Sequence, residues 1–145
     1  MAALIDTNVL VYRFDFRFAQ KQQTAEAVLR RCIAEGTARV AHQVIVEFFS
    51  VVTTPNKRRP LLLTREEAFR EVEFLLTEFD VLYPNRVVLR TALHGVATHQ
   101  LSWYDAHLWA YAEVYGISEL ISEDFQHDRV YGTVRALNPF LPHQN

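Results

Sequence analysis

The sequence contains little of several residue types, and each shortage excludes a class of protein. Its single cysteine, Cys32, excludes an internal disulfide framework and suits a reducing compartment. No apolar run approaches the roughly 20 residues that a membrane-spanning helix needs. The first residues lack the basic and apolar regions of a secretory signal, and no internal repeat or low-complexity linker is present. We therefore expect a cytoplasmic protein in which residues 1–145 form a single domain.

The charge balance argues against a general attraction to nucleic acid. The 15 lysines and arginines are offset by 17 acidic residues, which gives a net charge of −2. A local patch can still act, however, and the cations are almost all arginine, because only Lys21 and Lys57 are lysines. The forked donors of arginine suit phosphates and carboxylates better than a lysine ammonium does.

Hydrophobic periodicity predicts alternating strands and helices, the pattern of an α/β protein built around a parallel sheet. One helix is expected around residues 25–33, ending at Gly36, and another begins at the capping box Thr64-x-x-Glu67. The run 42–54 is compatible with either a strand or a buried helix, and the proline-flanked segment 54–60 is expected to be a loop. Further expected elements are strands at residues 2–5, 39–41, 81–83, 117–121 and 134–137, a helix beginning near Pro84, and a helix at 102–115 before Gly116.

Four carboxylates occupy positions that call for an explanation. Asp6 directly follows the first expected strand, and Asp124 stands two residues after Ser122, where a late strand ends. Asp105 lies in the first turn of a helix, and Glu47 interrupts an apolar run. In parallel sheets, reactive groups gather beyond the carboxyl ends of the strands, so these acids can meet there.

Each acid also has a plain structural interpretation when it is taken alone. Asp6 can cap a helix, Asp105 can complete a capping box with Ser102, and Asp124 can be solvated in a polar loop. Glu47 resists such an account, because a buried carboxylate costs several kcal/mol unless it is paired. No lysine or arginine lies within a helical turn of Glu47, so its partner must come from elsewhere in the chain.

Convergence on a divalent cation explains all four acids together. Clustered carboxylates with no basic residue nearby repel one another, and a bound metal removes that repulsion. Oxygen ligands suit Mg²⁺ or Mn²⁺, which retain waters and can activate one of them toward a phosphate. The sequence therefore predicts metal-dependent phosphate chemistry at Asp6, Glu47, Asp105 and Asp124.

The segments around these acids resemble, in order, those of the PIN domain (PilT N-terminus) and, within that family, the VapC-type toxin ribonucleases of VapBC toxin–antitoxin pairs. The matching segments are "LIDTNVLVY", "HQVIVEFFSVVT", "LSWYDAHLWAYA" and "LISEDFQHDR", followed by "ALNPF". The resemblance implies a three-layer α/β/α sandwich with a central parallel sheet and an Mg²⁺- or Mn²⁺-dependent endoribonuclease site. It also implies an RNA substrate, an antitoxin partner and a homodimer. The family's metal-binding and catalytic acids fall on Asp6, Glu47, Asp105 and Asp124, supported by Thr7, Asn8 and Ser122.

The fourth acid is the weakest of these assignments, since Glu123 and Asp128 stand close to Asp124 in the sequence. Asp124 is preferred because Ser122-x-Asp124 keeps the hydroxyl-then-acid spacing that is usual in the family. Asp15 has no such support and is interpreted as a loop residue.

Other polar and aromatic groups offer secondary candidates. Cations that can hold a phosphodiester backbone, or can simply be solvated, are Lys57, Arg58 and Arg59 in one loop and Arg13, Arg17 and Lys21 near the first strand. Trp103 and Tyr104 flank Asp105, where an aromatic ring can stack on a base. Zinc is not favoured, because the histidines (His42, His94, His99, His107, His127 and His143) lack the usual ligand spacing.

Two other functions compete with the nuclease hypothesis. A haloacid dehalogenase-type phosphatase requires Asp-x-Asp after its first strand, but Asn8 occupies the place of the second acid. A catalytically inactive PIN-like module would bind RNA or protein without cleaving it, although four mutually repelling acids argue against lost chemistry.

Overall fold

The computed structural model describes residues 1–142, so His143 lies outside the described residues. The strands form one six-stranded sheet in the order β3-β2-β1-β4-β6-β5. They are β1 (Ala3–Ile5), β2 (Ala38–Ala41), β3 (Asp80–Leu82), β4 (Glu119–Ile121), β5 (Val130–Tyr131) and β6 (Val134–Leu137). The helices are α1 (Thr7–Tyr12), α2 (Ala19–Glu35), α3 (His42–Thr53), α4 (Arg65–Glu78), α5 (Arg86–His99) and α6 (Trp103–Val114).

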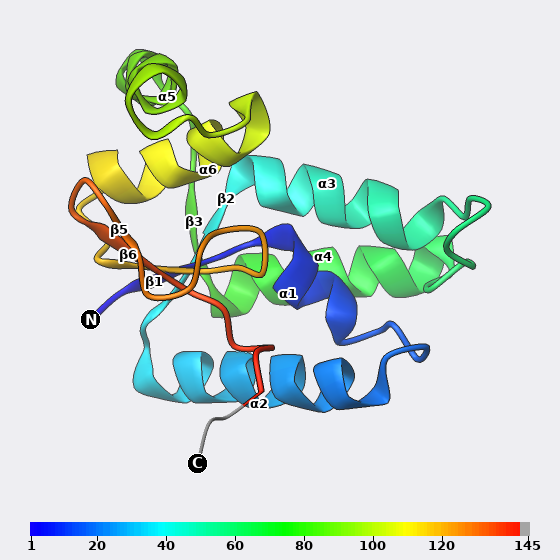
Figure 1. Cartoon of the computed structure of the whole chain (residues 1–145). Helices are drawn as coiled ribbons and strands as arrows, with labels where there is room; N and C mark the ends of the chain where they lie inside the picture. Colours follow the sequence, from blue (N-terminus) through cyan, green and yellow to red (C-terminus); the bar gives the residue numbers. More distant parts are fainter. Residues whose placement is uncertain (143–145) are drawn as a thin grey trace.

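Helices cover both faces of the sheet, which confirms the predicted three-layer α/β/α architecture. Figure 1 shows α5 and α6 on one side of the sheet and α2 on the other. The core is apolar and includes Leu4, Val40 and Leu120 on three adjacent strands, each fully buried. Among residues 1–142, no helix is long and apolar enough to cross a membrane.

The ambiguous run 42–54 is a helix, α3. Its buried side chains, Val44, Ile45, Phe48 and Val52, recur at intervals of three and four residues and so lie on one helical face. The opposite face reaches solvent, where the Val46 side chain is 57% exposed. Its β-branched residues therefore follow the period of a helix rather than that of a strand.

Local signals set several helix boundaries where the sequence predicted them. In the capping box of α4, the Thr64 amide donates to the Glu67 carboxylate at 2.9 Å, and the Glu67 amide donates to the Thr64 hydroxyl at 3.2 Å. Gly36 ends α2 with a φ of +69°, a conformation that costs glycine little because it has no Cβ. The short helix α1 was not predicted as a separate element.

The central strands are parallel, as predicted, and β5 adds an antiparallel strand at one edge, where it pairs with β6. Only Gly132 and Thr133 separate these two strands, and such a tight turn reverses the chain direction. Gly132 has a φ of +63°, which a two-residue hairpin turn requires. The other strand pairs are all parallel.

The strand order places a topological switch point between β1 and β4. From β1 the chain passes outward to β2 and β3 on one side, and it then returns to form β4 on the other side. The strands pair in register from Ala3–Glu119 to Ile5–Ile121, so both end at the same level. Open α/β sheets bind ligands in the crevice beyond such a pair of strand ends.

Candidate active site

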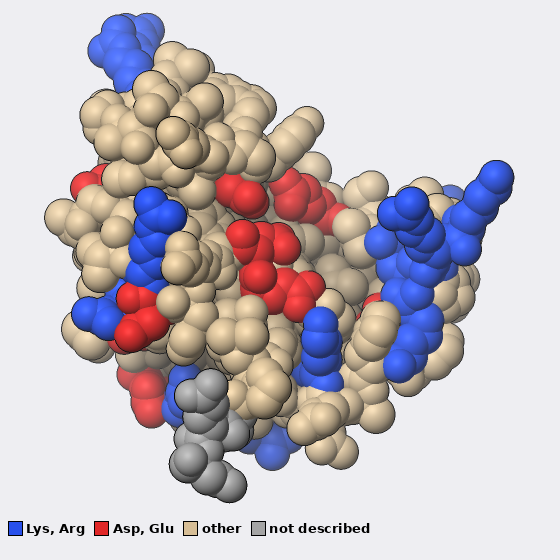
Figure 2. Space-filling view, viewed as in Figure 1, with Lys and Arg blue, Asp and Glu red and all other residues tan. Residues whose placement is uncertain are grey.

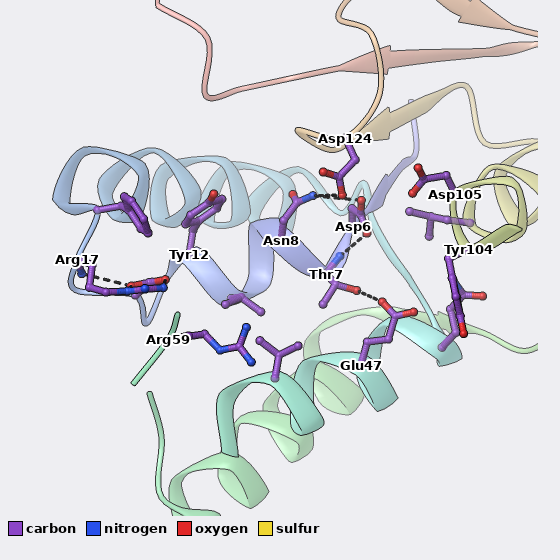
Figure 3. Close-up of a pocket in the computed structure, with 16 residues that line it drawn as sticks. Asp6, Thr7, Asn8, Tyr12, Arg17, Glu47, Arg59, Tyr104, Asp105 and Asp124 are labelled. Carbon is purple, nitrogen blue, oxygen red and sulfur yellow. Dashed lines mark hydrogen bonds and ion pairs between the residues drawn. The ribbon is translucent and has the colours of Figure 1, made fainter. Parts of the chain in front are cut away.

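A cavity of about 570 Å³ opens at this switch point. Its lining brings together the four acids that the sequence predicted, which come from the ends of β1 and β4 and from α3 and α6 (Figure 3). They are Asp6, Glu47, Asp105 and Asp124. In the space-filling view, acidic side chains gather in a hollow at the centre of the same face (Figure 2).

Asp6 is the most buried of the four acids, with 7% of its surface exposed. Its Oδ1 accepts a 2.6 Å hydrogen bond from the Thr7 amide, as a helix cap does. Its Oδ2 accepts hydrogen bonds from the Ser122 hydroxyl at 2.5 Å and from the Asn8 side-chain amide at 3.2 Å. Asp6 is therefore both the cap of α1 and a wall of the cavity.

Burial raises the pKa of Asp6 from 3.8 to about 7. The hydrogen bonds from Ser122 and from the Thr7 amide lower this pKa, while the negative charges of Asp124 and Asp105 raise it further. A carboxylate in this environment lacks the positive charge that would make its ionised form favourable. The electrostatics of the cavity thus favour binding of a cation.

Asp105 lies on the first turn of α6, and its amide donates a 3.2 Å hydrogen bond to Oγ of the helix cap, Ser102. Burial raises the pKa of the Asp105 carboxyl, the Ser102 hydroxyl lowers it, and the charge of Asp124 raises it. Ser102 therefore caps α6, as the sequence suggests, and Asp105 also lines the cavity.

Asn8 ties the ends of the two central strands together. Its side-chain amide nitrogen lies 3.2 Å from Asp6 Oδ2, 3.1 Å from Asp124 Oδ2 and 3.4 Å from the Ser122 hydroxyl. The Asp124 amide also donates to the Ser122 hydroxyl at 3.0 Å. These contacts fix the Asp124 segment against the end of β1.

Glu47 reaches the cavity from α3, and the partner it lacked in the sequence is Thr7. The Thr7 hydroxyl donates a 2.9 Å hydrogen bond to Glu47 Oε2. Glu47 was expected to be buried among apolar residues, but it is only partly buried, because its helix borders the open cavity. Exposure to solvent on that side reduces the expected desolvation cost.

The two alternatives to Asp124 point elsewhere. Glu123 accepts hydrogen bonds from the Tyr12 hydroxyl at 2.6 Å and from the Lys21 ammonium at 3.0 Å. Asp128 pairs with Arg135 at 2.6 Å on the exposed surface. Of the three acids, only Asp124 lines the cavity.

Two features of the cavity were not predicted. Asp15 lies in a loop as expected, but it is 3% exposed, lines the cavity and forms a forked ion pair with Arg17 at 2.9 and 2.7 Å. The hydrogen bonds from Arg17 lower the pKa of Asp15. The premise that no basic residue lies near the acids is also wrong, since Arg17 and Arg59 line the same cavity. The spacing Asp15-x-Arg17 was the one sequence feature that could have indicated this ion pair.

The aromatic residues of α6 separate into two groups. Trp109 and Tyr111 belong to the core, with 2% and 1% of their surfaces exposed. Tyr104 is 72% exposed and lines the cavity near Asp105 (Figure 3). Tyr104 is thus the aromatic side chain of this helix that a substrate in the cavity can reach.

The acids suit a cation that keeps part of its water. Among residues 1–142, no three His, Cys, Asp or Glu side chains lie close enough to form a ready-made metal shell. Mg²⁺ usually keeps several waters and takes only one or two protein carboxylates directly. The donors here are all carboxylates, and the pKa of Asp6 is raised by burial first and then by the negative charges of Asp124 and Asp105. Asp6, Glu47, Asp105 and Asp124 can therefore hold Mg²⁺ or Mn²⁺, directly or through water.

Comparisons with known proteins agree with this geometry. The family profile described as PIN domain matches residues 3–133. The chain belongs to the PIN domain family. No curated protein sequence matches it closely enough to count as a relative.

Solved structures share the fold at low sequence identity. A toxin–antitoxin complex from Klebsiella pneumoniae superposes with a TM-score of 0.66 at 17% identity, covering 96% of this chain and 98% of that one. The structure of FitAB bound to an IR36 DNA fragment gives 0.67 at 19% identity, with 99% of each chain covered. The Mycobacterium tuberculosis toxin VapC20, described as sarcin–ricin loop cleaving, gives 0.59 at 18% identity and covers 82% of this chain and 87% of that one.

Proposed function

We propose that the chain is an Mg²⁺- or Mn²⁺-dependent endoribonuclease that cuts single-stranded or loop RNA. The observation that carries the proposal is the meeting of Asp6, Glu47, Asp105 and Asp124 in one cavity at the switch point of the sheet. The similarity in fold to a toxin described as cleaving the sarcin–ricin loop supports RNA as the substrate class.

The residues around the acids hold the carboxylates in fixed positions before a substrate arrives. The Thr7 amide and the Ser122 hydroxyl orient Asp6, while the Thr7 hydroxyl orients Glu47. Asn8 links Asp6 to Asp124. A bound divalent cation would supply charge stabilisation to the phosphate and activation of water. Such preorganisation avoids reorientation of the acids during the reaction.

Cleavage of RNA with and without metal tests this function. Purified protein is incubated with mixed RNAs in Mn²⁺ or in EDTA, and wild type is compared with Asp6→Asn and the matched surface variant Asp128→Asn. We expect fragments only with Mn²⁺, unchanged cleavage by Asp128→Asn, and a loss on the order of 100-fold or more in Asp6→Asn. RNA binding without metal-dependent fragments would contradict the proposal and leave the inactive binding module.

We also propose that the chain is the toxin of a type II toxin–antitoxin pair. Its fold is similar to that of a chain in a toxin–antitoxin complex, and in the proposed pair a cognate antitoxin would hold the nuclease inactive. The test is to express the chain alone and together with the neighbouring reading frame. Growth arrest by the chain alone, relieved by the neighbour and absent in Asp6→Asn, is expected. Arrest that the Asp6→Asn variant retains would contradict a nuclease toxin.

A homodimer completes the proposed assembly. The outer face of α5 exposes Val87 and Leu93, which are 55% and 57% accessible, so an apolar surface is available for a second copy. Light scattering coupled to size exclusion measures the mass directly, and a mass near the 16.9 kDa of one chain would contradict the dimer.

A further inference from the structure

The cavity has two ends of opposite charge. In Figure 3 the acids Asp6, Asp105 and Asp124 lie toward one end, and the Arg59 side chain points into the cavity from the other end, where Arg17 also lies. Figure 2 shows Lys and Arg gathered over the connection between α3 and α4, beside the acidic hollow. A negatively charged chain that lies in this hollow can reach cations on the side of the α3–α4 connection.

Two of the other cations close to the cavity are already neutralised. Arg17 forms a forked ion pair with Asp15, and Lys21 pairs with Glu123 at 3.0 Å. Arg59 has no carboxylate within ion-pair distance among residues 1–142, and both Asp15 oxygens are already held by Arg17. Arg59 therefore keeps its positive charge available to a ligand.

The guanidinium of Arg59 also has unused hydrogen-bond donors. Its Nη2 donates to the Thr54 carbonyl at 3.3 Å, and its Nε is buried without a partner in the described part of the chain. A guanidinium has five N–H donors, and leaving one of them buried and unpaired is unfavourable. Only one terminal N–H of Arg59 has a partner among the described residues, so its other terminal N–H groups can donate to a ligand that accepts two hydrogen bonds.

The loop that carries Arg59 is held in place by its own contacts. Arg17 donates a hydrogen bond to the Arg58 carbonyl, which joins the loop after α1 to the loop after α3. The Asn56 side chain accepts from the Arg58 amide at 2.8 Å, and the backbones of Asn56 and Arg59 pair at 2.9 and 3.3 Å. The position of Arg59 is therefore set before a ligand binds.

We propose that Arg59 binds an RNA phosphodiester adjacent to the one held at the acidic end of the cavity; this inference rests on the proposed function. The guanidinium fork matches two phosphate oxygens. A phosphate group is repelled by the four acids, and a cation at the opposite end of the cavity offsets that repulsion. RNA extends through the cavity with a phosphate at each end, so a single chain can use both.

Binding of RNA without cleavage tests the assignment. Fluorescence anisotropy measures the affinity of the folded protein for a short labelled single-stranded RNA in EDTA. Arg58→Ala is the matched control, because it removes the same charge from an exposed side chain of the same loop that does not line the cavity. We expect Arg59→Ala to weaken binding about tenfold more than Arg58→Ala does. Arg59→Lys, which keeps the charge but loses the fork, should restore part of the affinity.

Neutral backbone substitution locates the contact. Replacing single phosphates of the RNA by methylphosphonates should reveal one position that weakens binding to wild type but not to Arg59→Ala. Equal affinities of Arg59→Ala and Arg58→Ala would overturn the proposal. The proposal would also be overturned if Arg59→Ala weakened binding of a glutamate-rich peptide but not of RNA. That result would assign Arg59 to a protein carboxylate.

The outcome is independent of catalysis. If wild type fails to cleave RNA in Mn²⁺ but binds it with dependence on Arg59, the nuclease function is wrong and the phosphate subsite stands. If wild type cleaves RNA but Arg59→Ala binds as Arg58→Ala does, the subsite is wrong and the nuclease function stands.

Discussion

The Ser122 hydroxyl donates a 2.5 Å hydrogen bond to Asp6 Oδ2, although 116 residues separate the two in the sequence. This bond joins the ends of β1 and β4 and lowers the pKa of a carboxyl that burial otherwise raises. Ser122 is completely buried, so its hydroxyl cannot be replaced by bulk water without rearrangement. The Ser122–Asp6 hydrogen bond therefore affects both the stability of the sheet and the ionisation of Asp6.

Removing the hydroxyl should raise the pKa of Asp6 and weaken the fold. We expect Ser122→Ala to shift the Asp6 pKa above about 7 and to lower the free energy of unfolding by about 1–3 kcal/mol, because a buried acceptor loses its donor. Carboxyl NMR titration measures the pKa, and urea unfolding measures the stability. Ser50→Ala, an exposed position on α3, is the control. An unchanged pKa in Ser122→Ala would contradict the role of this bond.

The metal-free protein should lose stability as the pH rises toward neutrality. The folded-state pKa of Asp6, about 7, exceeds the unfolded value of 3.8, so the folded state binds the proton more tightly. The contribution of Asp6 is therefore fully present below pH 3.8 and is lost as the pH rises through about 7. Between pH 5 and pH 7.5 the loss amounts to about 2–3 kcal/mol.

Urea unfolding in EDTA at the two pH values, for wild type and Asp6→Asn, measures the contribution of Asp6 to the free energy of unfolding. The amide of the variant can still cap α1 but does not ionise. The free energy of unfolding of wild type should fall by this amount between the two pH values. The Asp6→Asn variant should lack this part of the fall. Equal pH dependence in both proteins would show that Asp6 ionises as an ordinary exposed acid does.

Divalent cations should stabilise the folded protein. Mn²⁺ at about 100 times its dissociation constant adds roughly 2.7 kcal/mol to the free energy of unfolding, because it binds the folded state selectively. Thermal unfolding should show a rise in Tm for wild type and for Asp128→Asn, and little or no rise for Asp6→Asn or Asp105→Asn. An equal rise in all four proteins would place the cation elsewhere.

The packing of α5 on α6 depends on Gly95. A Cβ at this position would lie 2.7 Å from two ring atoms of Trp109, which is 2% exposed and cannot move away freely. We expect Gly95→Ala to destabilise the protein by about 1–3 kcal/mol through overpacking. Val96→Ala, at an exposed position of the same helix, should change stability by only about 0.5 kcal/mol. A neutral or stabilising Gly95→Ala, measured by urea unfolding, would contradict this packing.

Much of the fold could be predicted because local and periodic signals agree with the tertiary structure. The capping box at Thr64, the stop at Gly36 and the alternation of strands with helices are all encoded within short windows. The hairpin of β5 and β6 was missed because a two-residue strand has too few positions to show a period. The helix α3 stayed ambiguous because β-branched residues occupy a helical face.

The site could be predicted in part, for a different reason. Acids at the ends of parallel strands lie at the same edge of a sheet, so the approach of Asp6 to Asp124 follows once β1 and β4 are neighbours. The environment of each acid does not follow from its neighbours in sequence. Asp15 is buried by a loop, and Arg59 enters the cavity from a connection whose path no periodicity specifies.

The central claim is that one cavity uses its carboxylates to bind a divalent cation. A crystal of the protein soaked in Mn²⁺ tests this most directly, through the position of the anomalous scattering peak. We expect a peak in the cavity at a direct-ligand distance of roughly 2 Å from an oxygen of Asp6 or of one of its three partner acids, with waters completing the shell. A peak only at some other surface, or no peak at a saturating concentration, would contradict the account.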